Sequence, residues 1–127
     1  MIEVASLDLP ATLESPRSAR RFVTDRLHGW GYHSIGPDAG LLTSELVTNA
    51  VRHGSAPYAV QVVDLHDGVV VTVEDAGHEL PIRRYAAPEA EGGRGLAIVD
   101  SIAAAWGAWA IPEDGKLVWF RLAAGQG

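Results

Sequence analysis

Apolar and polar residues follow strand-like and helix-like spacings in separate segments of the chain. Residues 2–9 alternate imperfectly between apolar and polar side chains and stop at Pro10, which predicts a first strand at a sheet edge. Apolar residues then recur at three- and four-residue spacing, which predicts a first helix from about Ser15 to Trp30. The same spacing predicts a second helix from about Pro37 to Arg52, and Gly54 follows its end.

Four later runs rich in β-branched and aromatic residues predict two hairpins. The runs are residues 58–65, 69–74, 106–111 and 117–122. Asp67-Gly68 joins the first pair and is a strong hairpin signal, and residues 112–115 form the expected turn of the second. A third helix is predicted between the hairpins, from Leu96 to Ala105. The irregular residues 76–93 before it are long for a connection, which is typical of a functional lid or a disordered segment.

The order of these elements is β-α-α-β-β-lid-α-β-β. Because the strands come in hairpins, we expect a mostly antiparallel sheet with the helices layered on one face. The predicted fold is therefore an α+β two-layer sandwich. By its length, the chain of residues 1–127 is expected to form one domain, and it shows no internal repeat.

Composition narrows the classes of function. The net charge is −6, from sixteen acidic residues against nine arginines and a single lysine, and the bases form no stripe, which argues against direct nucleic-acid binding. No apolar run is long enough to span a bilayer, and the first residues do not resemble a secretory signal. The chain has no cysteine and therefore no disulfide or thiolate site. A cytoplasmic protein is the expectation.

Three polar residues share one face of the second predicted helix. Glu45, Asn49 and Arg52 are spaced i, i+4 and i+7, which aligns them along the helix. A carboxylate and a carboxamide one turn apart suit Mg²⁺, which takes few protein oxygens alongside phosphate oxygens. The carboxylate is also a candidate general base. Taken alone, the three residues are more typical of a solvated polar face.

Two further segments suggest parts of a nucleotide site. Asp75 ends an apolar strand, where its carboxylate can accept a hydrogen bond from an exocyclic amine, and Gly77 permits close approach to the backbone. Alone, this run is more typical of a turn. Gly93, Arg94 and Gly95 precede the helix predicted from Leu96, and backbone amides at a helix N-terminus favour phosphate. A flexible glycine hinge is an equal alternative there.

In this order, the three segments resemble the GHKL ATPase superfamily. Residues 45–54 resemble its N-box, Asp75-Ala76-Gly77 its G1-box, and Gly93-Arg94-Gly95-Leu96 its G2-box. The short chain and the closing run from Gly115 to Phe120 are similar to one branch, the stand-alone bacterial anti-sigma-factor serine/threonine kinases and their ATP-binding relatives in actinomycetes. The similarity covers nearly all of residues 15–122 and implies a Bergerat-type ATP-binding fold.

The resemblance implies ATP and Mg²⁺ as cofactors and gives the candidate residues roles. Glu45 would be the general base, Asn49 the magnesium ligand and Asp75 the acceptor for the adenine amine. Residues 76–92 would form the ATP lid. The remaining ATP-binding candidates are Arg52, Gly77, Gly93, Arg94, Gly95, Leu96 and Lys116.

Proteins of that branch phosphorylate a serine on an anti-sigma antagonist of the STAS type and sequester a sigma factor, commonly as homodimers. The resemblance therefore implies these partners and a homodimer, whereas charge and hydropathy argue against contact with a membrane or nucleic acid. A non-catalytic, nucleotide-gated module of the same fold is the alternative. It is favoured by Lys116, which stands where family members often carry threonine. Lys116 is expected either to contact the phosphates or lid or to face solvent.

Overall fold

The computed structural model describes residues 2–10, 12–53, 58–77, 91–111 and 115–124, with only the backbone described at His53 and residues 91–96. The described chain forms a sheet and a layer of helices, in the order that the sequence predicts. The elements are β1 (Glu3–Leu9), α1 (Ser15–Gly29), α2 (Gly36–His53), β2 (Tyr58–Asp64), β3 (Gly68–Asp75), α4 (Glu91–Ile102), β4 (Ala105–Ile111) and β5 (Gly115–Ala123).

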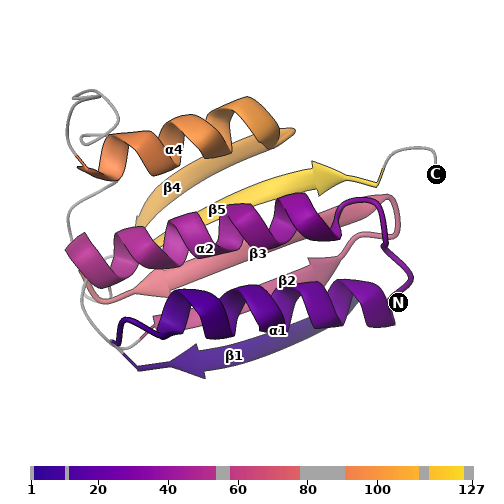
Figure 1. The fold of residues 1–127 in the computed structure, drawn as a ribbon, viewed down its shortest axis with the longest axis horizontal. Helices are drawn as coiled ribbons and strands as arrows, with labels where there is room; N and C mark the ends of the chain where they lie inside the picture. Colours follow the sequence, from indigo (N-terminus) through magenta and orange to yellow (C-terminus); the bar gives the residue numbers. More distant parts are fainter. Residues whose placement is uncertain (1, 11, 54–57, 78–90, 112–114, 125–127) are drawn as a thin grey trace.

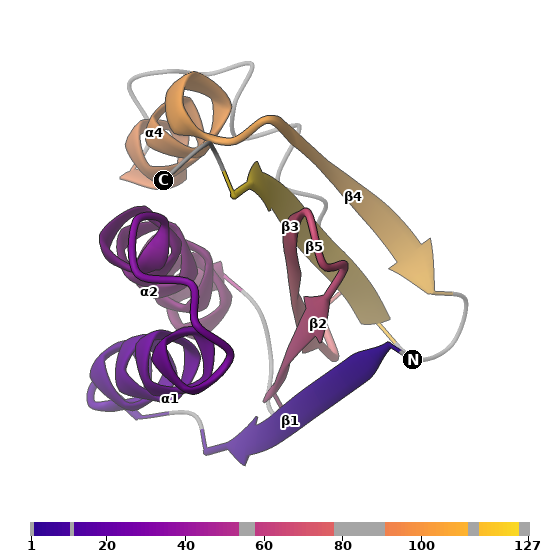
Figure 2. The same ribbon diagram turned by 90° about the vertical axis from the view of Figure 1, so that its right-hand side faces the viewer.

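The five strands form one antiparallel sheet in the order β1-β2-β3-β5-β4. All three described helices lie on the same face of it (Figure 1), and the end-on view separates the sheet from the helix layer (Figure 2). The predicted α+β two-layer sandwich is therefore confirmed. No helix in the described ranges is both long and apolar enough to cross a bilayer.

The register of the first hairpin is set by a short turn between β2 and β3. The Leu65 N–H donates to the Gly68 carbonyl at 2.9 Å, and both His66 and Gly68 adopt positive φ, at 71° and 154°. A Cβ at position 68 would lie 2.2 Å from the Leu122 carbonyl oxygen, so this glycine is required for the approach of β5. The predicted Asp-Gly hairpin is confirmed.

The third helix begins earlier than its apolar pattern predicts. Helix α4 starts at Glu91 and ends at Ile102, whereas the sequence predicts residues 96–105. Its apolar positions begin only at Leu96, so periodicity marks the later turns and leaves the glycine-rich first turn looking like a loop. Gly92 therefore belongs to α4 and not to the predicted lid; residues 78–90 of that lid lie outside the described chain.

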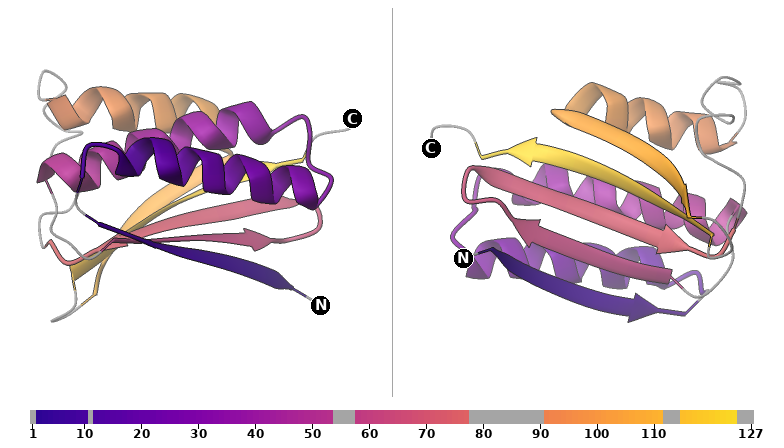
Figure 3. Two further views of the ribbon diagram at one scale, coloured as in Figure 1. Left: turned by 60° about the horizontal axis from the view of Figure 1, so that its bottom comes forward. Right: turned by 180° about the vertical axis from the view of Figure 1, so that it is seen from behind.

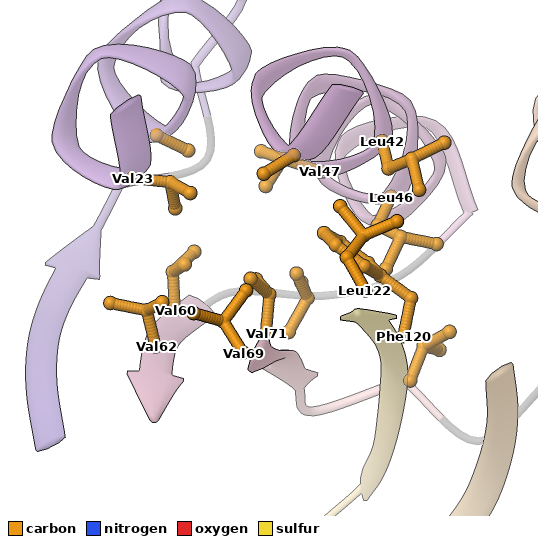
Figure 4. Packing of buried hydrophobic residues seen from close by; sticks show 14 of the residues in the cluster. Val23, Leu42, Leu46, Val47, Val60, Val62, Val69, Val71, Phe120 and Leu122 are labelled. Atoms are coloured by element: carbon orange, nitrogen blue, oxygen red, sulfur yellow. The ribbon is translucent and has the colours of Figure 1, made fainter. Parts of the chain in front are cut away.

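The core lies between the sheet and the first two helices. Alternate residues of β2, β3 and β5 point toward α1 and α2, as the burial of Val60, Val71 and Phe120 shows. From the helices, Val23 and Val47 point back toward these strands (Figure 4). Because β3 is paired on both sides and covered by α2, it is the central strand that fixes the sheet against the helices.

Tyr32 connects the segment after α1 to the β2–β3 turn. Its hydroxyl donates to Asp64 Oδ1 at 2.6 Å, and the His66 N–H donates to the same oxygen at 2.9 Å. Burial, the hydrogen bond to Asp64 and the negative charges of Asp64 and Asp67 raise the pKa of Tyr32 to about 12. This contact links the α1–α2 connection to the end of the sheet where β2 ends and β3 begins.

The raised pKa of Tyr32 predicts a loss of stability in alkali. Between about pH 10 and pH 12 the unfolded state loses the phenol proton and the folded state keeps it, so the free energy of unfolding falls as pH rises through that window. Tyr32→Phe should lower the free energy of unfolding by about 1 kcal/mol below pH 10. Its further decline up to pH 12 should be shallower than that of the unaltered protein. Urea unfolding across this range measures both, and identical pH slopes in the two proteins would contradict the assignment.

Candidate functional site

Four elements meet at one end of the sandwich. Helix α2 ends there at His53, β3 ends at Asp75, α4 begins at Glu91, and β5 begins at Gly115. The front and rear views agree on this arrangement (Figures 1 and 3). Helix α2 also packs directly against α4 and β3. The three sequence segments that suggest a nucleotide site are thus brought to the same end of the fold.

Helix α2 carries the polar face at this end. Leu42, Leu46 and Ala50 bury one side of the helix, which leaves Glu45 half-buried beside them and Arg52 exposed. On the same helix, Asn49 is only 7% exposed, and its Nδ2 is buried with no hydrogen-bond partner in the described chain. Such unpaired buried groups are rare and costly, so the amide points to a ligand or ordered water that completes it.

Asp75 and Lys116 form a buried ion pair at the end of the sheet. Lys116 Nζ donates to Asp75 Oδ1 at 2.9 Å, and the Gly77 N–H donates to the same oxygen at 2.7 Å. Asp75 is 2% exposed and Lys116 1% exposed. The expectation that Lys116 faces solvent is therefore wrong; its ammonium contacts the carboxylate that the resemblance assigns to the adenine amine.

Strand register produces this contact. Asp75 and Lys116 are directly paired in the β3–β5 ladder, so their side chains lie on the same, helix-covered face. Gly115 allows β5 to begin there. Its φ is +120°, and a Cβ on it would lie 2.0 Å from the Asp75 carbonyl oxygen and 2.6 Å from Ala76 Cα. Only glycine fits, because any side chain would push β5 away from the end of β3.

Tyr58 is a neighbour of this pair that the sequence analysis did not select. It begins β2 and is 2% exposed. Burial raises the pKa of Tyr58, and the negative charge of Asp75 raises it further, so the phenol stays neutral beside the carboxylate. The sequence could have identified Tyr58 from the two-residue period of β2. That period puts Tyr58 on the same face as the buried Val60 and Val62, which is the face that carries the site.

The glycine-rich segment forms the first turn of α4. The first four N–H groups of an α-helix have no partner inside it, so the backbone amides from Glu91 to Arg94 have no partner within α4 and are candidates to bind an anion at this end. The side chains of Arg94 and Leu96 lie outside the described part, as does that of His53. The predicted phosphate contacts of Gly93, Arg94 and Gly95 remain predictions.

Some candidate residues contact one another directly, and others only lie at the same end of the fold. Asp75, Gly77 and Lys116 are in direct contact, whereas no hydrogen bond within the described chain connects Glu45 or Asn49 to them. Nor do the described residues include a group of three or more histidine and acidic side chains able to hold a metal. A Mg²⁺ ion here would depend on Asn49 and phosphate oxygens, a donor set that Mg²⁺ commonly uses with water.

The fold and the site together define a domain of the ATP-binding α+β class. A family model described as the histidine kinase-like ATPase domain matches residues 9–122, and the chain belongs to this family. No curated protein matches the chain. The superfamily resemblance is thereby confirmed, and with it the expectation of an ATP-binding domain.

The buried ion pair predicts strongly coupled effects on stability. Asp75→Asn or Lys116→Met alone leaves a buried charge unpaired and should lower the free energy of unfolding by about 3–5 kcal/mol. The double variant should be more stable than the sum of these losses implies, because both charges are removed together. Urea unfolding of the four proteins measures the coupling.

The exposed pair of Arg121 and Asp67 is a matched control. Their closest side-chain atoms are 3.8 Å apart, and the side chains are 42% and 75% exposed. The corresponding cycle, with Arg121→Met and Asp67→Asn, should give a coupling of about 1 kcal/mol or less. A coupling at Asp75–Lys116 no larger than this control would contradict the burial of the pair.

Proposed function

We propose that the protein is an ATP-dependent protein-serine/threonine kinase of the anti-sigma type, which phosphorylates an STAS-type antagonist. The observation that carries the proposal is the buried Nδ2 of Asn49, which has no hydrogen-bond partner among the described residues and lies on the helix face that also bears Glu45. Family membership supports ATP binding, and the helix that carries both residues, α2, ends where β3 ends and β5 begins (Figure 1). The finer assignment to the anti-sigma branch rests on the sequence resemblance.

The residues present fit a magnesium nucleotide. The Asn49 side chain offers an oxygen to Mg²⁺, and its unpaired Nδ2 would then donate to an adjacent oxygen. Asp75 offers a carboxylate oxygen to the adenine amine, while the amides at the start of α4 offer donors to the phosphates. When bound, Mg²⁺ neutralises charge that develops on the phosphate oxygens.

Glu45 is positioned one helical turn before Asn49 and is half-buried. In the proposed reaction its carboxylate accepts the proton of a serine hydroxyl as the serine oxygen bonds to the γ-phosphorus. The bond from that phosphorus to the bridging oxygen breaks, and the electron pair leaves with ADP. Phosphoryl transfer needs positioning and charge stabilisation more than covalent help, which suits a site with few reactive side chains.

Replacing the proposed general base, Glu45, tests phosphoryl transfer separately from ATP binding. Glu45→Gln keeps the size and polarity of the side chain but removes its ability to accept a proton, so serine phosphorylation should fall at least about 100-fold. ATP affinity should change little, since Glu45 is not assigned a nucleotide contact. The measurement is capture of partners from extract of the source cells in Mg-ATP, with mass spectrometry of phosphoserine and a separate ATP titration.

Asp38→Asn is the matched control, because Asp38 is an exposed acidic residue in the first turn of the same helix. It should phosphorylate the partner as the unaltered protein does. Full phosphorylation by Glu45→Gln would contradict the role of the base. Loss of ATP binding in Glu45→Gln would assign the residue to nucleotide binding instead.

The Asp75–Lys116 contact favours a second candidate, a nucleotide-gated binding module without catalysis. A nucleotide that interacts with a preformed buried ion pair can favour one conformation over another, and that difference in affinity is enough to gate a partner. Partners captured only in ATP, without any ATP-dependent phosphoserine, would support this candidate over the kinase.

A further inference from the structure

The Asp75–Lys116 pair has hydrogen-bonding capacity that the described protein does not use. Oδ1 of Asp75 accepts two hydrogen bonds, from the Gly77 N–H and Lys116 Nζ, but no described residue donates to Oδ2. An ammonium has three donors, and described residues accept from only one of them at Lys116. A buried ion pair is stable only when its remaining polar atoms are also satisfied. The acceptor and donors that no described residue uses therefore point to a polar ligand.

We propose that Lys116 reads the base directly: its Nζ donates to the ring nitrogen N1 of adenine while Asp75 Oδ2 accepts from the adjacent exocyclic amine. The inference rests on the proposed function, which places the adenine amine at Asp75. It adds Lys116 as a second residue that contacts adenine, so that both members of the ion pair recognise the base. An acceptor beside a donor complements the edge of adenine, where an amine donor stands beside an unprotonated ring nitrogen.

The same geometry disfavours guanine. Along that edge guanine presents a carbonyl oxygen and two neighbouring donors, the N1–H and the N2 amine. A carboxylate matches two neighbouring donors best with both of its oxygens, but Asp75 Oδ1 already accepts two bonds at 2.7 and 2.9 Å. One guanine donor would be left unpaired in a buried site, which is costly. The pair thus favours adenine over guanine, because Asp75 has one oxygen, Oδ2, left to accept from the base and adenine presents one donor group on that edge.

The backbone holds Lys116 in the required position. Its pairing with Asp75 in the β3–β5 ladder and the close approach of Gly115 to Asp75 and Ala76 fix the backbone of Lys116 beside Asp75. With a side chain 2% exposed, Nζ has exchanged water for the carboxylate. A donor fixed in this way loses less conformational entropy on binding than a mobile surface lysine does.

A nucleotide that lacks N1 tests the proposal. In 1-deaza-ADP, a C–H group replaces N1 and cannot accept a hydrogen bond. The unaltered protein should bind 1-deaza-ADP about tenfold or more weakly than ADP, as expected for a lost bond to a charged donor. Lys116→Met should bind both nucleotides alike. Arg121→Met, which changes a cation elsewhere on β5, should keep the discrimination of the unaltered protein.

Nuclear magnetic resonance gives a second readout that needs no substitution. Lys116 is the single lysine of the chain, so protein labelled with ¹⁵N at lysine Nζ gives one ammonium resonance. Addition of ADP should shift this resonance and also the resonance of ¹⁵N-labelled N1 in the nucleotide. Addition of 1-deaza-ADP should leave the ammonium resonance nearer its position in the free protein.

The outcomes separate this inference from the proposed function. Equal affinity for ADP and 1-deaza-ADP in the unaltered protein, with an unmoved N1 resonance, would overturn the role of Lys116 and leave the kinase proposal intact. Weaker binding of 1-deaza-ADP without serine phosphorylation would support base reading and overturn the kinase. Failure to bind ADP at all would overturn both.

Discussion

The buried ion pair between Asp75 and Lys116 is the interaction on which the rest of the site depends. Two opposite charges 2.9 Å apart, almost fully removed from water, are tolerated only with close geometry and further hydrogen bonds. The β3–β5 register and Gly115 supply the geometry. The hydrophobic layer between the sheet and α2 holds β3 in place. The core therefore serves the site by fixing one strand end against another.

In the proposed site, separate elements of the fold would contact separate parts of a nucleotide. The strand ends of β3 and β5 present a charged acceptor and donor suited to a base. Helix α2 presents a carboxylate and an unpaired amide one turn apart, which suit a metal-bound phosphate. The start of α4 adds backbone amides. Because these groups lie on different elements, the account predicts that substitutions can alter base recognition and phosphoryl transfer independently.

Local patterns predicted much of the fold, and long-range pairing explains what they missed. The Asp67-Gly68 turn and the apolar spacing of α2 were readable because they depend on neighbouring residues. The start of α4 was misplaced because its glycine-rich first turn has no apolar periodicity. The contact of Lys116 with Asp75 was not predictable, since it joins residues 41 positions apart through strand register. The roles of the site residues remain predictions.

A structure of the protein with ADP and Mg²⁺ tests the central claim most directly. The account predicts the base at Asp75 and Lys116, with the phosphates between α2 and the start of α4. A nucleotide bound elsewhere would contradict it, for instance in the surface groove beside α1 that Phe22 and Trp30 line. So would a base at this end of the sheet that contacts neither Asp75 nor Lys116.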